Sequence, residues 1–246
     1  MSFNRMDVQG NSYFINRYIS FNPIKSFTEE IIEFVFDFAY NMTFGGKGEH
    51  RDHRSGGGLR RRKGEIFANT FQGKLAECAI YEELRPQTNI SVPDFSTLGL
   101  GEWDTVDLLI GNYKLSIKST KSFGNLLLLE TDDWDYHGRY IPNNQIYDFT
   151  FLVRLNPYCE DILRKNFMLY NDAADYQTLK SLVCSQKWEY DIPGFITLPE
   201  LQYIIRNNFI IPRSAMLNGK KSMDATNYYV QSGDMHPVND LFSFLE

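Results

Sequence analysis

Asp107 and Lys118 are two ionisable residues that lie close together in a mainly apolar part of the sequence. Asp107 stands in the run Val106-Asp-Leu-Leu-Ile110, and Lys118 ends the run Leu115-Ser-Ile-Lys118. Burial of a charge in apolar surroundings is costly unless the charge is paired or binds a metal ion. The pattern therefore allows two interpretations: a surface ion pair on an exposed hairpin, or a carboxylate that holds a divalent cation beside a lysine.

Gly111 and Asn112 are a turn signal that predicts a hairpin between strands at 105–110 and 113–120. In that register Asp107 faces Ser116, and the alternation of side chains places Asp107, Ser116 and Lys118 on one face. The other residues predicted on this polar face are Thr105, Leu109 and Lys114. The residues predicted on the opposite, apolar face are Val106, Leu108, Ile110, Leu115 and Ile117.

An aspartate on one strand and the run Ser116-Ile-Lys118 on the next resemble the core motif of the PD-(D/E)XK nucleases. The run 118–130, with 138–142 and 147–157, resembles a group of bacterial restriction-type endonucleases. The resemblance covers about residues 65–157 and implies an α/β (α+β) fold, a mixed β-sheet flanked by helices in the order helix, hairpin, helix, strand. It also implies a Mg²⁺ cofactor bound mainly by Asp107, with Lys118 holding the attacking water or contacting the scissile phosphate.

Ser116 departs from the motif, because the family has an acidic residue at this position. A hydroxyl is a poor replacement for a carboxylate around Mg²⁺. Some type II restriction enzymes with this serine supply the acid from a downstream segment, which makes Glu130 one candidate. Glu77 is the rival, because the family often presents a glutamate on the helix before the hairpin. A site that uses both acids as catalytic and metal-binding residues is the third possibility. The simpler interpretations are that Glu77 is a solvated helix residue and that Glu130 caps the segment after it.

The activity that the resemblance implies is site-specific cleavage of double-stranded DNA, as in a type II restriction endonuclease. A homodimer is expected by analogy, because palindromic sites are matched by two-fold protein symmetry. One alternative is a repair or recombination nuclease that recognises DNA structure. The other is a DNA-binding module of the same fold that has lost cleavage, and Ser116 is the residue that supports it.

The segment 44–63 combines many glycines with basic residues and is interpreted as a loop that contacts DNA. Between Lys47 and Lys63 there are seven basic residues against two acidic ones, although the whole chain has a net charge of −6. The residues expected to contact DNA are Arg51, Arg54, Arg60, Arg61, Arg62, Lys63 and Lys121. His50 and His53 lack enough partners for a zinc site.

The elements that must position these residues can be traced along the chain. Apolar spacing predicts a helix at about 27–41, with the capping-box spacing of Ser26 and Glu29, and a second helix at about 65–84. A β-like run at 149–155 is expected to complete the sheet, 126–130 is too short to assign, and 198–207 has helical spacing. We expect a single domain over 1–246 with its core at about 65–157 and a C-terminal elaboration at 158–246.

Composition sets the broad class. Hydrophobic residues make up 43% and charged residues 23% of the chain, which is typical of a globular protein. Three widely spaced cysteines are interpreted as reduced thiols, and neither a signal peptide nor a membrane span is evident. The sequence therefore predicts a protein of the bacterial cytoplasm. The absence of a P-loop and of a GxGxxG motif gives no support to a nucleotide cofactor.

Overall fold

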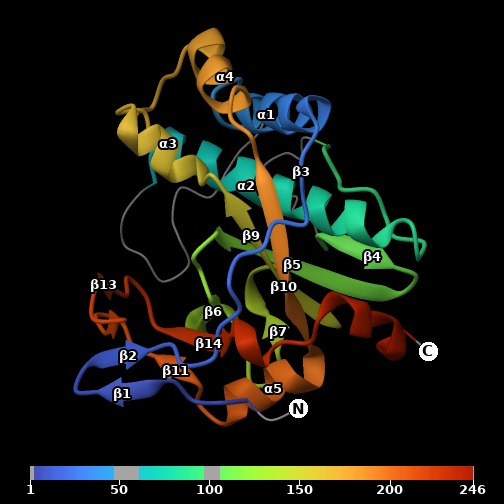
Figure 1. Ribbon diagram of the computed structural model, residues 1–246, viewed down its shortest axis with the longest axis vertical. Helices are drawn as coiled ribbons and strands as arrows, with labels where there is room; N and C mark the ends of the chain where they lie inside the picture. Colours follow the sequence, from blue (N-terminus) through green and yellow to red (C-terminus); the bar gives the residue numbers. More distant parts are fainter. Residues whose placement is uncertain (1–2, 47–60, 97–105, 246) are drawn as a thin grey trace.

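The computed structural model describes residues 3–46, 61–96 and 106–245. Within these ranges the chain has a mixed α/β fold with several sheets (Figure 1). The α-helices are α1 (Glu29–Thr43), α2 (Lys63–Leu84), α3 (Cys159–Lys165), α4 (Tyr176–Cys184) and α5 (Leu198–Arg206). The 3-10 helices are η1 (Thr131–Asp133), η2 (Ile141–Asn143), η3 (Ser232–Asp234) and η4 (Val238–Phe244). The strands are β1 (Asp7–Gln9), β2 (Ser12–Phe14), β3 (Lys25–Ser26), β4 (Leu108–Ile110), β5 (Tyr113–Lys121), β6 (Leu126–Glu130), β7 (Arg139–Tyr140), β8 (Gln145–Ile146), β9 (Phe149–Asn156), β10 (Glu189–Thr197), β11 (Ile210–Ile211), β12 (Met216–Leu217), β13 (Lys221–Ser222) and β14 (Asn227–Gln231).

The largest sheet has five strands in the order β3-β10-β9-β5-β4. β5 and β9 are parallel and the other neighbouring pairs are antiparallel, so the sheet is mixed. β9 is buried along its length except at its last residue, which accounts for its mainly apolar sequence. The connection from β5 to β9 contains β6, β7 and β8, whereas the resemblance implied a helix at this place.

The large sheet separates two hydrophobic clusters. Leu115 and Ile117 of β5 belong to the first cluster, with residues of α1, α2, α3 and α4. Leu152 of β9 and Ile196 of β10 belong to the second cluster, with residues of β6, β14 and α5. Figure 1 shows α1 to α4 in the upper part of the molecule and α5, β11 and β14 in the lower part. In the described part of the chain, no helix has the length and apolar character needed to cross a membrane.

The hairpin formed by β4 and β5 has the predicted register. Leu108 pairs with Leu115 and Ile110 pairs with Tyr113, and Gly111 adopts the left-handed conformation that a tight turn requires (φ 55°). However, β4 begins only at Leu108, because the chain bends at Asp107. Val106 therefore packs against the second cluster, so its predicted place beside Leu108 was wrong.

Local hydrogen bonds explain where the helices begin. α1 begins after Thr28, whose Oγ1 accepts a hydrogen bond from the Ile31 amide at 3.4 Å, so the cap is not Ser26. α2 begins at Lys63, where the Arg62 amide donates to the Glu65 carboxylate at 2.9 Å. The helices predicted at 27–41, 65–84 and 198–207 are thus confirmed as α1, α2 and α5, with shifts of one or two residues at most ends.

The C-terminal part of the chain contributes to the central sheet. The segment 158–246 was expected to be an elaboration, but β10 lies inside the large sheet between β3 and β9. The run 126–130 is strand β6, and it pairs with β14 in a three-stranded sheet of order β11-β14-β6. The run 149–155 is confirmed as β9, which pairs with both β5 and β10.

A buried ion pair joins the neighbouring strands β9 and β10. Arg154 of β9 has no exposed surface, and its Nε and Nη2 atoms lie 2.8 and 2.5 Å from the two carboxylate oxygens of Asp191 on β10. The same guanidinium donates to the carbonyl oxygens of Ile19 and Ser20 and to Oδ1 of Asn125. The Arg154 side chain therefore connects β9 and β10 to the N-terminal segment and to the segment that follows β5.

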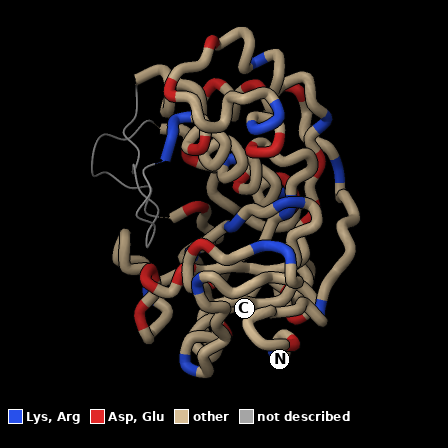
Figure 2. Tube along the Cα trace, turned by 90° about the vertical axis from the view of Figure 1, so that its left-hand side faces the viewer, with Lys and Arg blue, Asp and Glu red and all other residues tan. Residues whose placement is uncertain are grey.

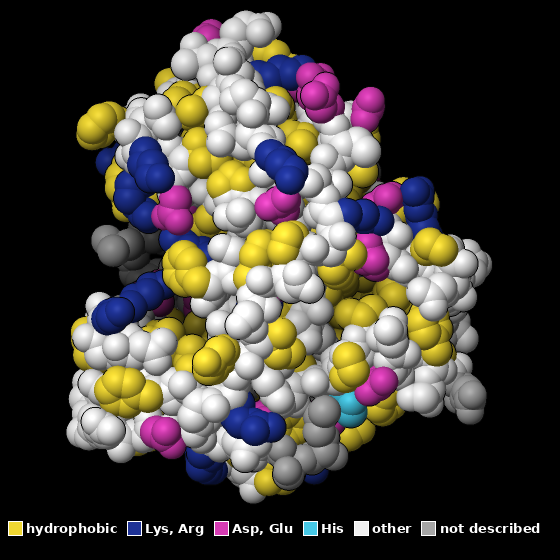
Figure 3. Space-filling model, in the orientation of Figure 1, with side chains coloured by type: hydrophobic (Ala, Val, Ile, Leu, Met, Phe, Trp, Pro, Cys, Tyr) yellow, Lys and Arg dark blue, Asp and Glu magenta, His cyan; other side chains and the backbone are white. Residues whose placement is uncertain are grey.

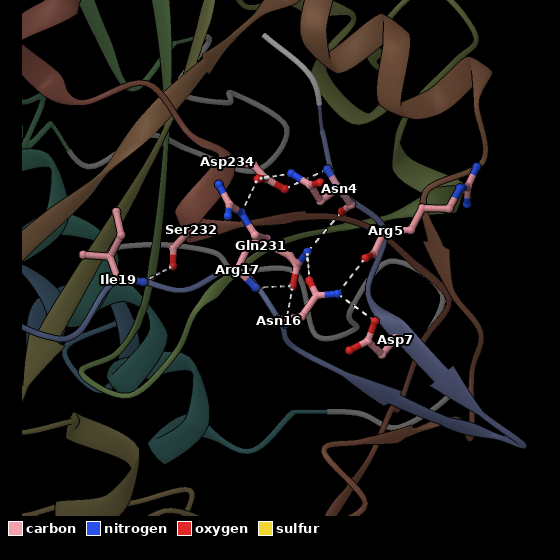
Figure 4. Close-up of polar contacts among 9 residues, drawn as sticks. All are labelled: Asn4, Arg5, Asp7, Asn16, Arg17, Ile19, Gln231, Ser232 and Asp234. Carbon is pink, nitrogen blue, oxygen red and sulfur yellow. Dashed lines mark hydrogen bonds and ion pairs between the residues drawn. The ribbon is translucent and has the colours of Figure 1, made fainter.

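A second polar network binds the N-terminal segment to β14 and η3 (Figure 4). Gln231 accepts from the Asn16 amide at 2.9 Å and donates to the Asn4 carbonyl at 3.1 Å, and Asp234 accepts from the backbone and side chain of Asn4. The Ile19 amide donates to Ser232 Oγ at 3.1 Å. These bonds satisfy buried polar groups, so they fix the course of the N-terminal segment across the lower part of the molecule.

We predict that Asp191→Asn lowers the free energy of unfolding by about 3–5 kcal/mol, because it leaves the buried Arg154 guanidinium without a counter-charge. Urea-induced unfolding followed by circular dichroism measures this loss. Lys187→Ala removes an exposed ion pair with Glu189 at the start of the same strand and is the matched control. An Asp191→Asn protein as stable as this control would contradict the structural role of the buried pair.

Candidate functional site

The Asp107 carboxylate lies at the end of the hairpin formed by β4 and β5. Its Oδ2 accepts a hydrogen bond from the Ile117 amide at 2.5 Å. The side chain thus supplies the acceptor that a longer β4 would offer to β5 through its backbone. Its Oδ1 has no hydrogen-bond partner among the described residues. One oxygen of the carboxylate is thus bonded to the backbone of β5, and the other has no hydrogen bond within the described residues.

Ser116 and Lys118 lie on the face of β5 that is opposite Leu115 and Ile117, as predicted. Ser116 is 1% exposed, and its Oγ has no hydrogen-bond partner within the described ranges. Lys118 is half-buried, and its Nζ lies 5.6 Å from the centre of the Tyr140 ring. No described acidic group lies within ion-pair distance of Lys118. The interpretation as a surface ion pair between Asp107 and Lys118 is therefore not supported.

The segment that contains β7 and β8 lies beside this face of β5. Lys114 Nζ donates to Gln145 Oε1 at 2.7 Å, and Tyr140 contacts Lys118, so the segment follows β5 between these two lysines. The Tyr140 ring lies 5.1 Å from the Trp134 ring, which is buried in the second cluster. Tyr140 was missed from the sequence, because nothing in the local pattern indicates that it meets a lysine 22 positions earlier.

The two candidate acids lie on different sides of the large sheet. Glu130 ends β6, opposite Asn227 of β14, and the leucines of β6 belong to the second cluster together with Tyr140. Glu77 is on α2, which packs on the other face of the sheet, and its Oε2 is 2.8 Å from Lys74 Nζ. Glu130 is therefore on the same side of the sheet as Ser116 and Lys118, whereas Glu77 belongs to an ion pair in the first cluster.

The basic segment expected to contact DNA is described only at its end. Arg61, Arg62 and Lys63 lie at the start of α2; the Arg62 guanidinium lies 2.6 Å from the Asp172 carboxylate, and the Lys63 side chain is exposed. Lys121 on β5 forms an ion pair with Asp161 at 2.8 Å. The calls that lie outside the described residues are Arg51, Arg54, Arg60, His50, His53 and Thr105.

Charges of both signs are distributed over the described chain. Figure 2 shows Lys and Arg positions interspersed with Asp and Glu positions along the chain. Figure 3, in the orientation of Figure 1, shows basic, acidic and hydrophobic side chains interspersed over this face of the molecule.

The cysteines offer no reactive thiolate. Burial raises the pKa of Cys78 to about 12 and that of Cys184 to about 11, and it raises the pKa of Cys159 well above the usual range. All three thiols stay protonated near neutral pH, and none is in a disulfide. Because the thiolate is the nucleophile and metal ligand, none of the three suits either role.

The described residues fit a magnesium ion only in part. Mg²⁺ binds oxygen ligands, often one or two carboxylates together with water and substrate phosphate. Asp107 Oδ1 and the buried Ser116 Oγ, neither with a described hydrogen-bond partner, provide one carboxylate and one hydroxyl on the same hairpin. Among the residues that the structure describes, no three His, Cys, Asp or Glu side chains gather as a metal-binding group. The second carboxylate is the component that this donor set lacks.

Searches of protein-family models, curated proteins and solved structures found no match to this chain.

We predict that Ser116→Ala raises the free energy of unfolding by about 1 kcal/mol in metal-free buffer, because it removes a buried hydroxyl that has no described hydrogen-bond partner. Chemical denaturation measures the change, and Ser119→Ala on the same strand controls for the different strand propensities of Ser and Ala. A clear loss of stability in Ser116→Ala would mean that the hydroxyl is already satisfied in the folded protein.

Proposed function

We propose that the chain is a magnesium-dependent endonuclease that hydrolyses double-stranded DNA at a short specific sequence, in the manner of a type II restriction enzyme. One observation carries the proposal. Asp107 directly precedes β4, and its carboxylate accepts a hydrogen bond from the Ile117 amide, next to Lys118 on β5. Lys118 has no ion-pair partner in the described ranges, and Asp107 keeps one oxygen without a described hydrogen-bond partner. A carboxylate and an ammonium group that are attached to the same part of β5 and are not paired with each other can bind ligands of opposite charge, a cation and a phosphate.

Asp107 and Lys118 each have a role in this proposal. Mg²⁺, when bound, would polarise the phosphoryl oxygen and acidify a water molecule. Asp107 Oδ1 would hold the ion, while the bond from the Ile117 amide to Oδ2 keeps the carboxylate oriented. Lys118 would donate to the scissile phosphate or to the attacking water, and the Tyr140 ring limits where its ammonium group can move.

Glu130 is the acid that we propose in place of the one absent at position 116. It ends β6, on the side of the large sheet that carries Ser116 and Lys118. Glu77 is less suited to the role, because its carboxylate already neutralises the buried Lys74 ammonium. The restriction-endonuclease-like arrangement of the fold belongs to the same proposal: α2 precedes the hairpin formed by β4 and β5, and β9 is the parallel neighbour of β5.

A DNA-binding module without cleavage is the second candidate, and Ser116 favours it. The serine leaves a single carboxylate on the hairpin, and the described residues contain no group of three acids. Such a module would bind DNA equally well with and without Mg²⁺ and would leave it intact.

We predict that Asp107→Ala and Lys118→Ala each reduce the cleavage of plasmid DNA in Mg²⁺ by at least roughly a hundredfold, because each removes a group that stabilises the transition state. Gel assays of cut plasmid measure the rate. Lys114→Ala is the matched control, since Lys114 lies on the same strand and bonds Gln145. Cleavage at the wild-type rate by either variant would refute the assignment. If the wild-type protein left the plasmid uncut, the DNA-binding module would be the remaining candidate function.

The same assay distinguishes the two candidate acids. Glu130→Gln should abolish Mg²⁺-dependent cleavage, whereas Glu77→Gln should lower protein stability and retain the rate per folded molecule, because its partner Lys74 is buried. Circular dichroism gives the folded fraction for each variant. The reverse result, with activity lost only in Glu77→Gln, would identify Glu77 of α2 as the second acid in place of Glu130.

A further inference from the structure

A cavity lies between the end of α2 and the C-terminal segment. Its volume is about 240 Å³, and its described lining residues come from the N-terminal segment, the end of α2, β10 and the start of η4. Figure 3 shows a recess with hydrophobic side chains to the right of the centre, below the end of α2 as drawn in Figure 1. None of these described lining residues belongs to β4 or β5, so the cavity is separate from the hairpin site.

An irregularity in β10 shapes one wall of this cavity. Between Asp191 and Gly194 the strand has one residue more than β9, so Ile192 and Pro193 form a bulge, and both line the cavity. Gly194 has a φ of 155°, and a Cβ atom there would lie 2.3 Å from the His236 carbonyl oxygen. The bulge and the C-terminal segment are thus packed closely together, and this wall is a fixed feature of the fold.

The other walls are also mainly apolar. Ile24 is 48% exposed, and its amide donates to the Tyr190 carbonyl at 2.8 Å, which holds the N-terminal segment against β10. Pro237 and Val238, at the start of η4, add to the apolar lining. Such walls favour a ligand that buries apolar surface. The volume is below the roughly 300–1,000 Å³ of sites for drug-sized ligands, so a matching ligand is small.

Glu83 is the charged residue among the described lining residues. Its Oε1 accepts from the Tyr190 hydroxyl at 2.7 Å and lies 2.9 Å from Lys25 Nζ. Its Oε2 has no hydrogen-bond partner within the described residues. The neighbouring Glu82 has its own partner in Arg85, at 3.1 Å, so the charge of Lys25 balances that of Glu83. The second oxygen of Glu83 is therefore suited to a neutral hydrogen-bond donor.

We propose that this cavity binds a small neutral molecule that has an apolar body and one N–H or O–H donor. The donor bonds Glu83 Oε2, and the body packs against Ile24, Ile192 and Val238. Hydrogen bonds to a carboxylate are stronger than those between neutral groups, so the donor contributes clearly to the affinity. The proposal does not depend on the proposed nuclease activity, because neither Asp107 nor Lys118 is among the described lining residues.

The experiment compares two compounds of nearly the same shape. Indole has one N–H donor, whereas benzofuran has an oxygen atom in its place and no donor. Each compound is titrated into the ¹⁵N-labelled full chain, and the backbone amide signals of Gln87, Val238 and Asn239 report binding at the cavity. Benzylamine, titrated in the same way, tests for a cationic ligand.

Three variants test the walls and the acceptor of the cavity. Glu83→Gln removes the carboxylate, and Val238→Phe fills part of the cavity. Glu82→Gln is the matched control, because it neutralises the adjacent acid of α2, which is not among the described lining residues. Circular dichroism confirms that each variant is folded before titration.

We expect wild type to bind indole roughly tenfold more tightly than benzofuran, because only indole donates to the carboxylate. Glu83→Gln should lose most of this preference, whereas Glu82→Gln should keep it. Val238→Phe should weaken the binding of both compounds, since both place their rings in the same space.

Several results would overturn the inference. Equal affinity of wild type for indole and benzofuran would remove the role of the donor, and shifts confined to amides elsewhere would remove the cavity. An unchanged preference in Glu83→Gln would exclude the proposed acceptor, and tighter binding of benzylamine than of indole would exclude a neutral ligand class. The comparison of compounds on wild type requires no substitution, so it remains decisive even where a variant fails to fold.

Discussion

The ion pair between Arg154 and Asp191 is the interaction on which the arrangement of this protein depends. A guanidinium with no exposed surface must satisfy its donors inside the protein, and Arg154 does so with a carboxylate, two carbonyl groups and an amide oxygen. These partners come from β10, from the N-terminal segment and from the connection after β5. Because an unpaired buried charge is so costly, none of these segments can move away without a penalty in stability. The pair therefore fixes the relative positions of parts of the chain that are far apart in sequence.

The candidate site depends on this frame through β9. β5 is the parallel neighbour of β9, with Lys118 opposite Leu152 and Thr120 opposite Arg154. The position of Lys118 is thus set by the sheet, and that of Asp107 by its hydrogen bond to the Ile117 amide of the same strand. Sites built on strands hold their side chains more accurately than sites on free loops. The same frame orients the turn that links β5 to β6, because Asn125 Oδ1 accepts a hydrogen bond from the Arg154 side chain.

The sequence allowed prediction of local features and failed where distant segments meet. The turn at Gly111 and the register from Leu108 to Leu115 follow from turn chemistry and side-chain alternation, which act over a few residues. Alternation gave the wrong side for Val106 because the chain bends at Asp107. No local pattern indicates that Leu126 pairs with Gln231, or that β10 enters the sheet after a separation of more than thirty residues from β9. The contact between Lys118 and Tyr140 was missed for the same reason: tertiary packing determines it.

Ser116 is the residue at which sequence and structure bear most directly on the proposed activity. In a folded protein a buried hydroxyl without a partner is unfavourable, so such a group persists either because its neighbours force it there or because a ligand satisfies it. Leu115 and Ile117 fix the direction of Ser116, since both must face the first cluster and alternation leaves Ser116 on the other side. A carboxylate at that buried position would need a cation at all times to offset its desolvation. Under the proposed function, serine at position 116 removes this cost from the hairpin, and the second acid has to come from another strand.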